Sequence, residues 1–189
     1  MKTLIAVPAG DGWIHASTIQ SLMGQMKGNR FLIVQGVSPV ALARNKVVEA
    51  FLKSDCDKLW MIDSDTIPPA DALEKLLEVD AAVVTGITPI LKREGTHNNV
   101  YARNGTGELV PIEVPTGKTF KIDACGASCL LIDRSVLKKM DAPWFAEMWS
   151  QDNTHVSEDI FFCNSMKEQG IEIVAHSQVV CQHVKEVLL

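Results

Sequence analysis

Residues 58–65 read Lys58-Leu59-Trp60-Met61-Ile62-Asp63-Ser64-Asp65, a run of four apolar residues that ends in two carboxylates. A short apolar run bounded by polar residues is typical of a strand buried on both faces, as in the parallel sheets of α/β proteins. Ligands bind to such sheets at the carboxyl ends of the strands. The stretch therefore predicts an α/β fold with a functional site at Asp63, Ser64 and Asp65.

The sequence on both sides of this strand alternates between strand-like and helix-like patterns. We expect strands over 3–8, 30–35, 58–63, 81–85, 128–132 and 171–175. We expect helices over 14–26, from Ser38-Pro39 to Ser54, from Pro68 to Leu77, from Asp133 onward and over 156–169. This order predicts a single-domain, Rossmann-like α/β fold with a mostly parallel central sheet flanked by helices.

Residues 87–120 break the alternation. Glycine, asparagine, threonine and proline accumulate there, between alternating fragments such as Val100-Tyr101-Ala102. This pattern predicts a small hairpin or flap. The flap divides the single domain of residues 1–189 into a first half over 1–86 and a second half over 121–189.

Composition and charge argue against several classes of protein. The length of 189 residues favours one domain, and 18 Lys and Arg against 23 Asp and Glu give a net charge of −5, which disfavours binding to bulk nucleic acid or anionic lipid. No stretch approaches the roughly 20 apolar residues of a membrane span, so we expect a soluble, cytoplasmic protein. The five cysteines include no C-x-x-C pair and are expected to be buried thiols rather than disulfides or zinc ligands.

Asp63 and Asp65 stand close together at the predicted strand end. Two like charges at this spacing are unfavourable unless a cation neutralises them, and hard oxygen ligands beside the hydroxyl of Ser64 suit Mg²⁺ or Mn²⁺. The alternative is an Asp-rich turn that caps the helix expected after Pro68-Pro69. Capping accounts for one carboxylate but not for both, so the pair favours a metal site.

Two other segments follow strands or begin helices and carry chemistry. The turn Pro8-Ala9-Gly10-Asp11-Gly12 permits close backbone approach to a ligand, but it lacks the spacing of a dinucleotide-binding loop or a P-loop. Ser157-Glu158-Asp159 opens the last long helix, where the acids either complement the helix dipole or supply a base that takes a proton from a hydroxyl. The aromatic residues Trp144, Phe145 and Trp149 before it either stack on sugar rings or belong to the core.

Taken in order, these residues resemble the GT-A fold glycosyltransferases of the inverting type. The resemblance covers most of the chain and rests on six segments: Val7-Pro8-Ala9, Leu42-Ala43-Arg44-Asn45, Trp60 to Asp65 with its D-x-D motif, Gly126 to Ile132 followed by Arg134, Ser157-Glu158-Asp159, and His183. A lone D-x-D motif is weak evidence. Its combination with the late Glu-Asp pair and the terminal histidine is more specific.

The resemblance implies that residues 1–86 bind a nucleotide-sugar donor, with a UDP-sugar favoured, and that residues 121–189 hold the catalytic and acceptor side. The implied donor-binding residues are Pro8, Ala9, Asp11, Arg44, Asp63, Ser64, Gly126 and Ala127. Pro8, Ala9 and Asp11 would cradle the base and ribose, and Arg44 would lie near the nucleotide.

The resemblance also implies metal ligands and a base. Asp65 and His183 would hold Mn²⁺ or Mg²⁺, and Asp63 would contact the ribose or a metal-bound water. Asp159 would be the catalytic base, with Glu158 beside it. The tail that carries His183 is then expected to dock on the sheet. The chain is short for this family, so a homo-oligomer, a partner subunit or the flap is expected to complete the acceptor side, and the acceptor itself is left unassigned.

Three alternatives remain open at this point. An apolar strand ending in D-x-D also occurs in haloacid dehalogenase-type phosphatases, but there it is the first strand and is followed by Thr or Val where this chain has Ile67. A nucleotidyltransferase would need basic residues in the turn after the first strand. A non-catalytic nucleotide-sugar-binding protein would have no need for Asp63, Asp65, Asp159 and His183 together.

Overall fold

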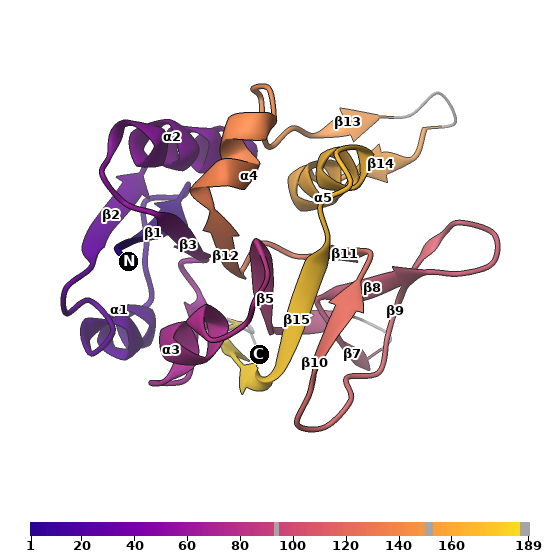
Figure 1. The fold of residues 1–189 in the computed structure, drawn as a ribbon, viewed down its shortest axis with the longest axis horizontal. Coiled ribbons are helices and arrows are strands. Elements are labelled where there is room, and N and C mark those ends of the chain that lie inside the picture. Colours follow the sequence, from indigo (N-terminus) through magenta and orange to yellow (C-terminus); the bar gives the residue numbers. More distant parts are fainter. Residues whose placement is uncertain (93–94, 150–152, 186–189) are drawn as a thin grey trace.

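The structure is a computed structural model that describes residues 1–92, 95–149 and 153–185 (Figure 1). The strands of its central sheet are β1 (Thr3–Ala9), β2 (Arg30–Gln35), β3 (Lys58–Ile62), β5 (Val83–Ile87), β10 (Thr119–Ile122), β12 (Cys129–Asp133) and β15 (Ile173–Val180). Its helices are α1 (Ala16–Met23), α2 (Val40–Lys53), α3 (Ala72–Leu77), α4 (Arg134–Lys139) and α5 (Glu158–Glu168). The order across the sheet is β10-β15-β5-β12-β3-β1-β2.

The central sheet is mixed. β1 is parallel to both β2 and β3, and β5 is parallel to β15. β12 runs antiparallel to β3 and β5, and β10 runs antiparallel to β15. A parallel connection needs a crossover, usually a helix, and the described residues between β5 and β12 contain no helix. The predicted α/β class is confirmed, with more antiparallel pairing than the expected mostly parallel sheet.

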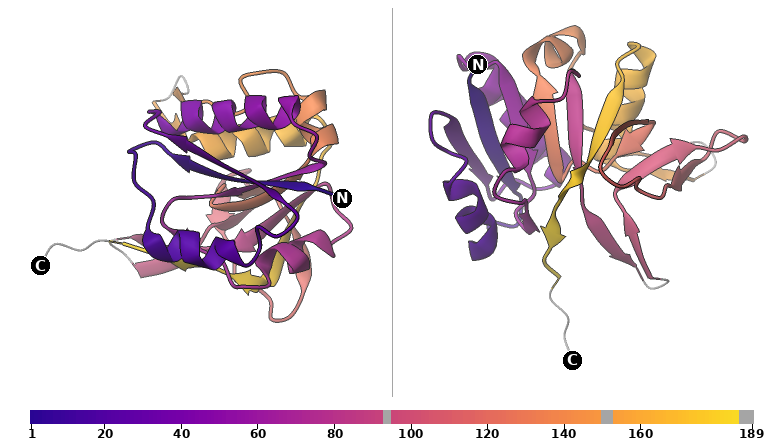
Figure 2. Two further views of the ribbon diagram at one scale, coloured as in Figure 1. Left: turned by 90° about the vertical axis from the view of Figure 1, so that its left-hand side faces the viewer. Right: turned by 60° about the horizontal axis from the view of Figure 1, so that its bottom comes forward.

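The core has two layers, one on each face of the sheet. α2, α4 and α5 cover one face, and α1 and α3 cover the other (Figure 2, left). Side chains of β3 alternate between them, so that Leu59 and Met61 join the first layer while Trp60 and Ile62 join the second, and all four are fully buried. The prediction of a strand buried on both faces is confirmed.

The flap consists of short strands. β6 (Pro89–Lys92) and β7 (Gly95–Asn98) form a hairpin, and β8 (Val100–Arg103) lies between β9 (Leu109–Pro111) and β11 (Ala124–Cys125) in a separate three-stranded sheet. The predicted hairpin is confirmed. Val100 of the flap and Ala124 of the adjoining β11 are fully buried in the first core layer, so the flap packs against the domain through β8.

The predicted helices and strands are found, and the differences lie at their ends. α1 begins only after His15, whose Nδ1 accepts the N–H of Ser17 (3.3 Å), rather than at residue 14. The last strand of the sheet extends to Val180 rather than ending at residue 175. The chain then continues into β16 (Gln182–His183), which pairs with β4 (Thr66–Ile67) directly after the D-x-D motif.

The aromatic segment divides between core and surface. Phe145 stacks on Phe162 with ring centroids 4.5 Å apart, and the indole N–H of Trp144 donates to the carbonyl of Leu137 (3.0 Å). Both residues are buried, so the core interpretation is confirmed for them. Trp149, in contrast, is 68% exposed on β13 (Met148–Trp149), which pairs with β14 (His155–Val156).

The expected burial of the cysteines is confirmed. All five cysteines are free and buried. Among the described residues, every helix is too short or too polar to cross a bilayer.

Candidate functional site

The D-x-D motif lies beside a second predicted segment because β12 is antiparallel to β3. Cys129 pairs with Ile62, so the residues before Cys129 adjoin the residues after Ile62. The N–H of Asp63 donates to the carbonyl of Ser128 (3.1 Å). Gly126 and Ala127 are thereby placed next to the strand end that carries Asp63.

A cavity of about 700 Å³ opens beside Ser64 and Asp65, a volume typical of small-molecule sites. Its walls come from the turn after β1, the start of α1 and the C-terminal tail, and they comprise Asp11, Trp13, Ile14, His15, Ala16, Ser64, Asp65, Val184 and Lys185. The carbonyl of Ser64 accepts the N–H of His15 (2.9 Å) and the hydroxyl of Thr18 (3.2 Å). These bonds hold the turn against the D-x-D motif.

Pro8 and Ala9, predicted to cradle the base, lie inside the buried strand β1 and are not among the residues that line this cavity. The carbonyl of Ala9 accepts the N–H groups of Gly12 (3.0 Å) and Gly36 (2.9 Å), so this strand end shapes the turn. Asp11 does line the cavity, and its Oδ1 accepts the N–H of Trp13 (3.0 Å).

Asp65 and His183 meet at the edge of the same cavity. His183 Nε2 lies 3.1 Å from Asp65 Oδ2, and His183 Nδ1 lies 2.9 Å from the carbonyl oxygen of Pro89. The tail is held in place by the β16–β4 pairing and by the N–H of Val184, which donates to the carbonyl of Asp65 (2.9 Å). The tail therefore docks next to the D-x-D motif.

The donor set at Asp65 and His183 fits a divalent cation. A carbonyl only accepts, so we assign the imidazole proton to Nδ1, which leaves the lone pair of Nε2 facing the carboxylate of Asp65. Among the described residues, no three His, Cys, Asp or Glu side chains cluster in a way that would hold a metal by themselves. Phosphate oxygens and water would have to complete the coordination of a metal held by these two residues.

Trp13, His15 and Lys185 were not identified from the sequence. Trp13 is 79% exposed on the cavity wall, and Lys185 Nζ lies 3.4 Å from Asp65 Oδ2. The position of Trp13 directly after Gly12 was a signal available in the sequence, because an aromatic residue in a ligand-binding turn suits a nucleobase. Nothing local to Lys185 indicated that it would lie beside Asp65.

Arg44 links Asp63 to Glu158. Its Nη2 lies 2.9 Å from Asp63 Oδ1, its Nε lies 3.3 Å from Glu158 Oε1, and its Nη1 donates to the carbonyl of Ala127 (3.4 Å). The Arg44 side chain is only 4% exposed. Its place near the nucleotide stays a prediction; the structure shows that it links two of the predicted carboxylates.

Burial and neighbouring charges have opposite effects on the pKa values of Arg44 and Glu158. Burial by itself lowers the pKa of Arg44, but the carboxylates of Asp63, Glu158 and Asp159 outweigh it, so the net pKa of Arg44 is raised. Burial raises the pKa of Glu158, and the nearby charge of Asp159 adds to this rise while Arg44 opposes it. Arg44 thus remains charged, and its charge opposes the rise that burial causes in the pKa of Glu158.

Replacing Arg44 by Met is expected to destabilise the fold by about 3 kcal/mol, because it leaves the carboxylate of Glu158 buried without its partner. Arg44→Lys keeps the charge, but a single ammonium does not reproduce the fork that reaches two carboxylates, so an intermediate loss is expected. Urea unfolding measures both. Arg30→Met, which removes an exposed ion pair with Asp55, is the control and should change stability little. Equal stability of Arg44→Met and the unaltered chain would contradict this role.

Asp159 has one oxygen, Oδ1, held by two donors, and its other oxygen, Oδ2, lies next to Gly126. Its Oδ1 accepts the N–H of Ile160 (2.8 Å) and the hydroxyl of Ser157. Its Oδ2 lies 3.5 Å from the point where a Cβ on Gly126 would stand. Glycine at 126 therefore leaves room next to this oxygen, and a group bound there would lie within reach of the carboxylate.

The flap contributes polar residues that sequence patterns did not indicate. Asn99 Oδ1 accepts the N–H of Thr88 (2.8 Å), and the hydroxyls of Ser128 and Thr88 are 2.9 Å apart. All three side chains are buried, and the hydroxyl of Ser128 links the flap to the Gly126–Ser128 segment. Tyr101 lies near Asp159 as well, since burial and then the charge of Asp159 raise the pKa of its phenol.

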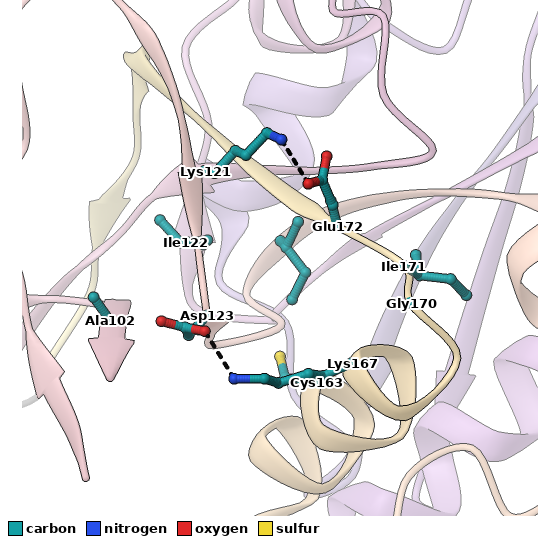
Figure 3. Close-up of a pocket in the computed structure, with 10 residues that line it drawn as sticks. Ala102, Lys121, Ile122, Asp123, Cys163, Lys167, Gly170, Ile171 and Glu172 are labelled. Carbon is teal, nitrogen blue, oxygen red and sulfur yellow. Dashed lines mark hydrogen bonds and ion pairs between the residues drawn. The ribbon is translucent and has the colours of Figure 1, made fainter. Parts of the chain in front are cut away.

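A second cavity of about 440 Å³ lies between β10 and the far end of α5, away from Glu158 and Asp159 (Figure 3). Lys121 points toward Glu172 (2.5 Å), and Lys167 points toward Asp123 (3.1 Å). Each lysine is already paired with an acid, so this cavity presents no uncompensated charge to a ligand.

Comparisons with known proteins agree with the observed fold. The family model described as "Glycosyltransferase like family 2" matches residues 19–187. No curated protein matches the sequence. Among solved structures, the fold is similar to that of A197 from STIV, with a TM-score of 0.73 and 22% identity over 98% of this chain and 87% of that one.

Two further similar structures were solved with nucleotides. GalNAc-T7 with UDP, GalNAc and Mn²⁺ has a TM-score of 0.62 and 10% identity over 99% of this chain and 44% of that one. S. aureus TarS 1–349 in complex with UDP-GlcNAc has a TM-score of 0.59 and 15% identity over 100% of this chain and 60% of that one. The present chain thus spans less than two thirds of each of these two proteins.

Proposed function

Because the chain belongs to glycosyltransferase-like family 2 and is therefore a glycosyltransferase, we propose that it moves a sugar from a nucleoside diphosphate to an acceptor hydroxyl with inversion at the anomeric carbon. A UDP-sugar is the donor we favour, since GalNAc-T7 was solved with UDP and TarS with UDP-GlcNAc. The observation that carries the proposal is the chain of contacts from the cavity at Asp65 to Asp63, Arg44, Glu158 and Asp159.

On the donor side, the nucleotide occupies the cavity beside Ser64 and Asp65. The indole of Trp13 offers a flat surface to the base, Asp11 accepts hydrogen bonds, and Lys185 offers a cation to the diphosphate. A divalent metal held by Asp65 and His183 would neutralise charge on the departing nucleoside diphosphate. Carboxylate and phosphate oxygens suit both Mn²⁺ and Mg²⁺, whereas the imidazole nitrogen of His183 favours Mn²⁺.

On the acceptor side, Asp159 Oδ2 takes the proton of the attacking hydroxyl. The N–H of Ile160 and the hydroxyl of Ser157 hold Oδ1, which orients the free oxygen toward the space above Gly126. Arg44 keeps Glu158 in place beside Asp159 and keeps Asp63 at the end of β3. A base on the face opposite the leaving group gives inversion.

The alternatives weighed from the sequence are less consistent with this site. Family membership sets aside the phosphatase and the nucleotidyltransferase. A phosphatase would also need Asp63 as a free nucleophile, whereas Asp63 Oδ1 is in an ion pair with a buried arginine. A homo-oligomer, a partner subunit or the flap remains the proposed source of the rest of the acceptor side.

The function is tested by release of nucleoside diphosphate from a set of donors. The whole chain is incubated with Mn²⁺ and UDP-glucose, UDP-galactose, UDP-GlcNAc, UDP-GalNAc or GDP-mannose, and the released diphosphate is measured with and without added acceptors. We expect release from one donor above the rate without enzyme. Binding of a donor with no release under any condition would instead identify a non-catalytic nucleotide-sugar-binding protein.

A further inference from the structure

We infer that the β13–β14 hairpin carries a subsite for a saccharide acceptor of more than one ring, with Trp149 as its stacking surface. The inference rests on the proposed function, and it names the acceptor class that this site takes. The chain has four tryptophans, and they divide equally between core and surface. Trp60 and Trp144 are buried in the core, whereas Trp13 and Trp149 are 79% and 68% exposed.

The two exposed tryptophans belong to different segments, each connected to one of the predicted carboxylate motifs. Trp13 lines the cavity next to Asp65, on the donor side. Trp149 pairs with His155 in the hairpin, and β14 runs through Ser157 directly into the start of α5 with Glu158 and Asp159. Figure 1 shows this hairpin beside α5. An exposed indole does not contribute the burial free energy that a core tryptophan such as Trp60 contributes. Its exposure close to the start of α5 therefore favours a binding role.

The distance along the chain indicates which ring of an acceptor Trp149 would meet. Ser157 is two residue steps beyond His155 along extended chain, about 7 Å, and Asp159 lies in the first turn of α5. A ring stacked on Trp149 is thus too distant to be the ring whose hydroxyl attacks. It is close enough to be a ring further along the same acceptor.

The surroundings of Trp149 suit a saccharide. The imidazole of His155 lies against the indole with ring centroids 4.9 Å apart, and His155 Nε2 is 3.8 Å from Glu147 Oε2. Both of these side chains are nearly half exposed, as is Met148. Sugar rings present C–H groups to an aromatic face and hydroxyls to neighbouring donors and acceptors, which matches an indole flanked by a carboxylate and an imidazole.

A lipid surface matches less well. Glu147 would have to be placed against the membrane, and the net charge of −5 opposes anionic lipid. Membrane binding through Trp149 is therefore treated as an outcome that would overturn the inference.

The test measures binding of the whole chain, with UDP and Mn²⁺ present, to immobilised tetrasaccharides of β-1,4-glucose, β-1,4-N-acetylglucosamine, α-1,4-glucose and α-1,6-mannose. We expect at least one to bind, with affinity reduced about tenfold in Trp149→Ala and largely retained in Trp149→Tyr, which keeps an aromatic face. Met23→Ala, which removes an exposed apolar side chain on α1, is the matched control and should bind as the unaltered chain does. Thermal unfolding verifies that each variant is folded.

Three results would overturn the inference: no tetrasaccharide bound by the unaltered chain, equal binding by Trp149→Ala, or binding to phosphatidylcholine vesicles that depends on Trp149. Release of nucleoside diphosphate by the unaltered chain is measured separately. Loss of that release together with Trp149-dependent saccharide binding would remove the proposed transferase function and leave the saccharide subsite. Release of nucleoside diphosphate without Trp149-dependent saccharide binding would keep the proposed transferase function and remove the saccharide subsite.

Discussion

Asp159→Asn is expected to lower the rate of sugar transfer by roughly 10²–10⁴-fold, the usual cost of a lost general base. An amide oxygen still accepts the N–H of Ile160 and the hydroxyl of Ser157, so the start of α5 should keep its conformation. The amide no longer takes a proton from the acceptor. Because Asp159 does not line the donor cavity, the affinity for UDP should barely change. Initial rates with saturating donor, together with UDP titration, measure the two effects.

Asp123→Asn is the matched control, since Asp123 lies at the other end of α5 in an ion pair with Lys167. It should transfer sugar at the rate of the unaltered chain. The anomeric configuration of the product provides an independent measurement, because a single displacement assisted by a base inverts it. A product that keeps the configuration of the donor would remove the base assignment while leaving the enzyme a glycosyltransferase.

Removal of divalent metal by EDTA is expected to stop release of nucleoside diphosphate, and added Mn²⁺ or Mg²⁺ should restore it. Asp65→Ala should be inactive even with added Mn²⁺ or Mg²⁺. Among the described residues, this substitution removes the only carboxylate that faces His183 Nε2. His183→Ala should weaken Mn²⁺ affinity by at least about tenfold. Loss of a residue that only hydrogen-bonds to a metal ligand already lowers metal affinity by roughly 10–100-fold, and loss of a ligand should cost no less. Titration of Mn²⁺ in the presence of UDP measures this affinity.

Asp80→Ala and His176→Ala are the controls for the two substitutions. Asp80 is exposed before β5, and His176 lies within β15 away from the tail strand. Neither should change the response to metal. Unchanged activity in EDTA would contradict a metal site at the D-x-D motif, and equal Mn²⁺ affinity in His183→Ala would leave Asp65 without its proposed partner.

The sequence by itself was sufficient for the α/β class, the buried strand β3 and the position of the D-x-D motif at its end. These features are local: the apolar run of residues 59–62 determines burial, and the acids that follow must emerge where the strand ends. The same holds for the helix start at Ser157, where polar residues precede an apolar pattern. Periodicity reports such features because each depends on neighbours a few residues apart.

The contacts that make the site were decided only by the tertiary structure. Arg44 meets Glu158 across 114 residues, and Asp65 meets His183 across 118. The first contact requires α2 and α5 to cover the same face of the sheet, and the second requires the tail to pair with β4. The antiparallel direction of β12 brings Gly126 next to Asp63 and Asp159, and it agrees with a flap whose described residues form strands rather than a crossover helix. A linear pattern carries no information on which distant segments share a face, because that choice is made by the packing of whole elements against one sheet.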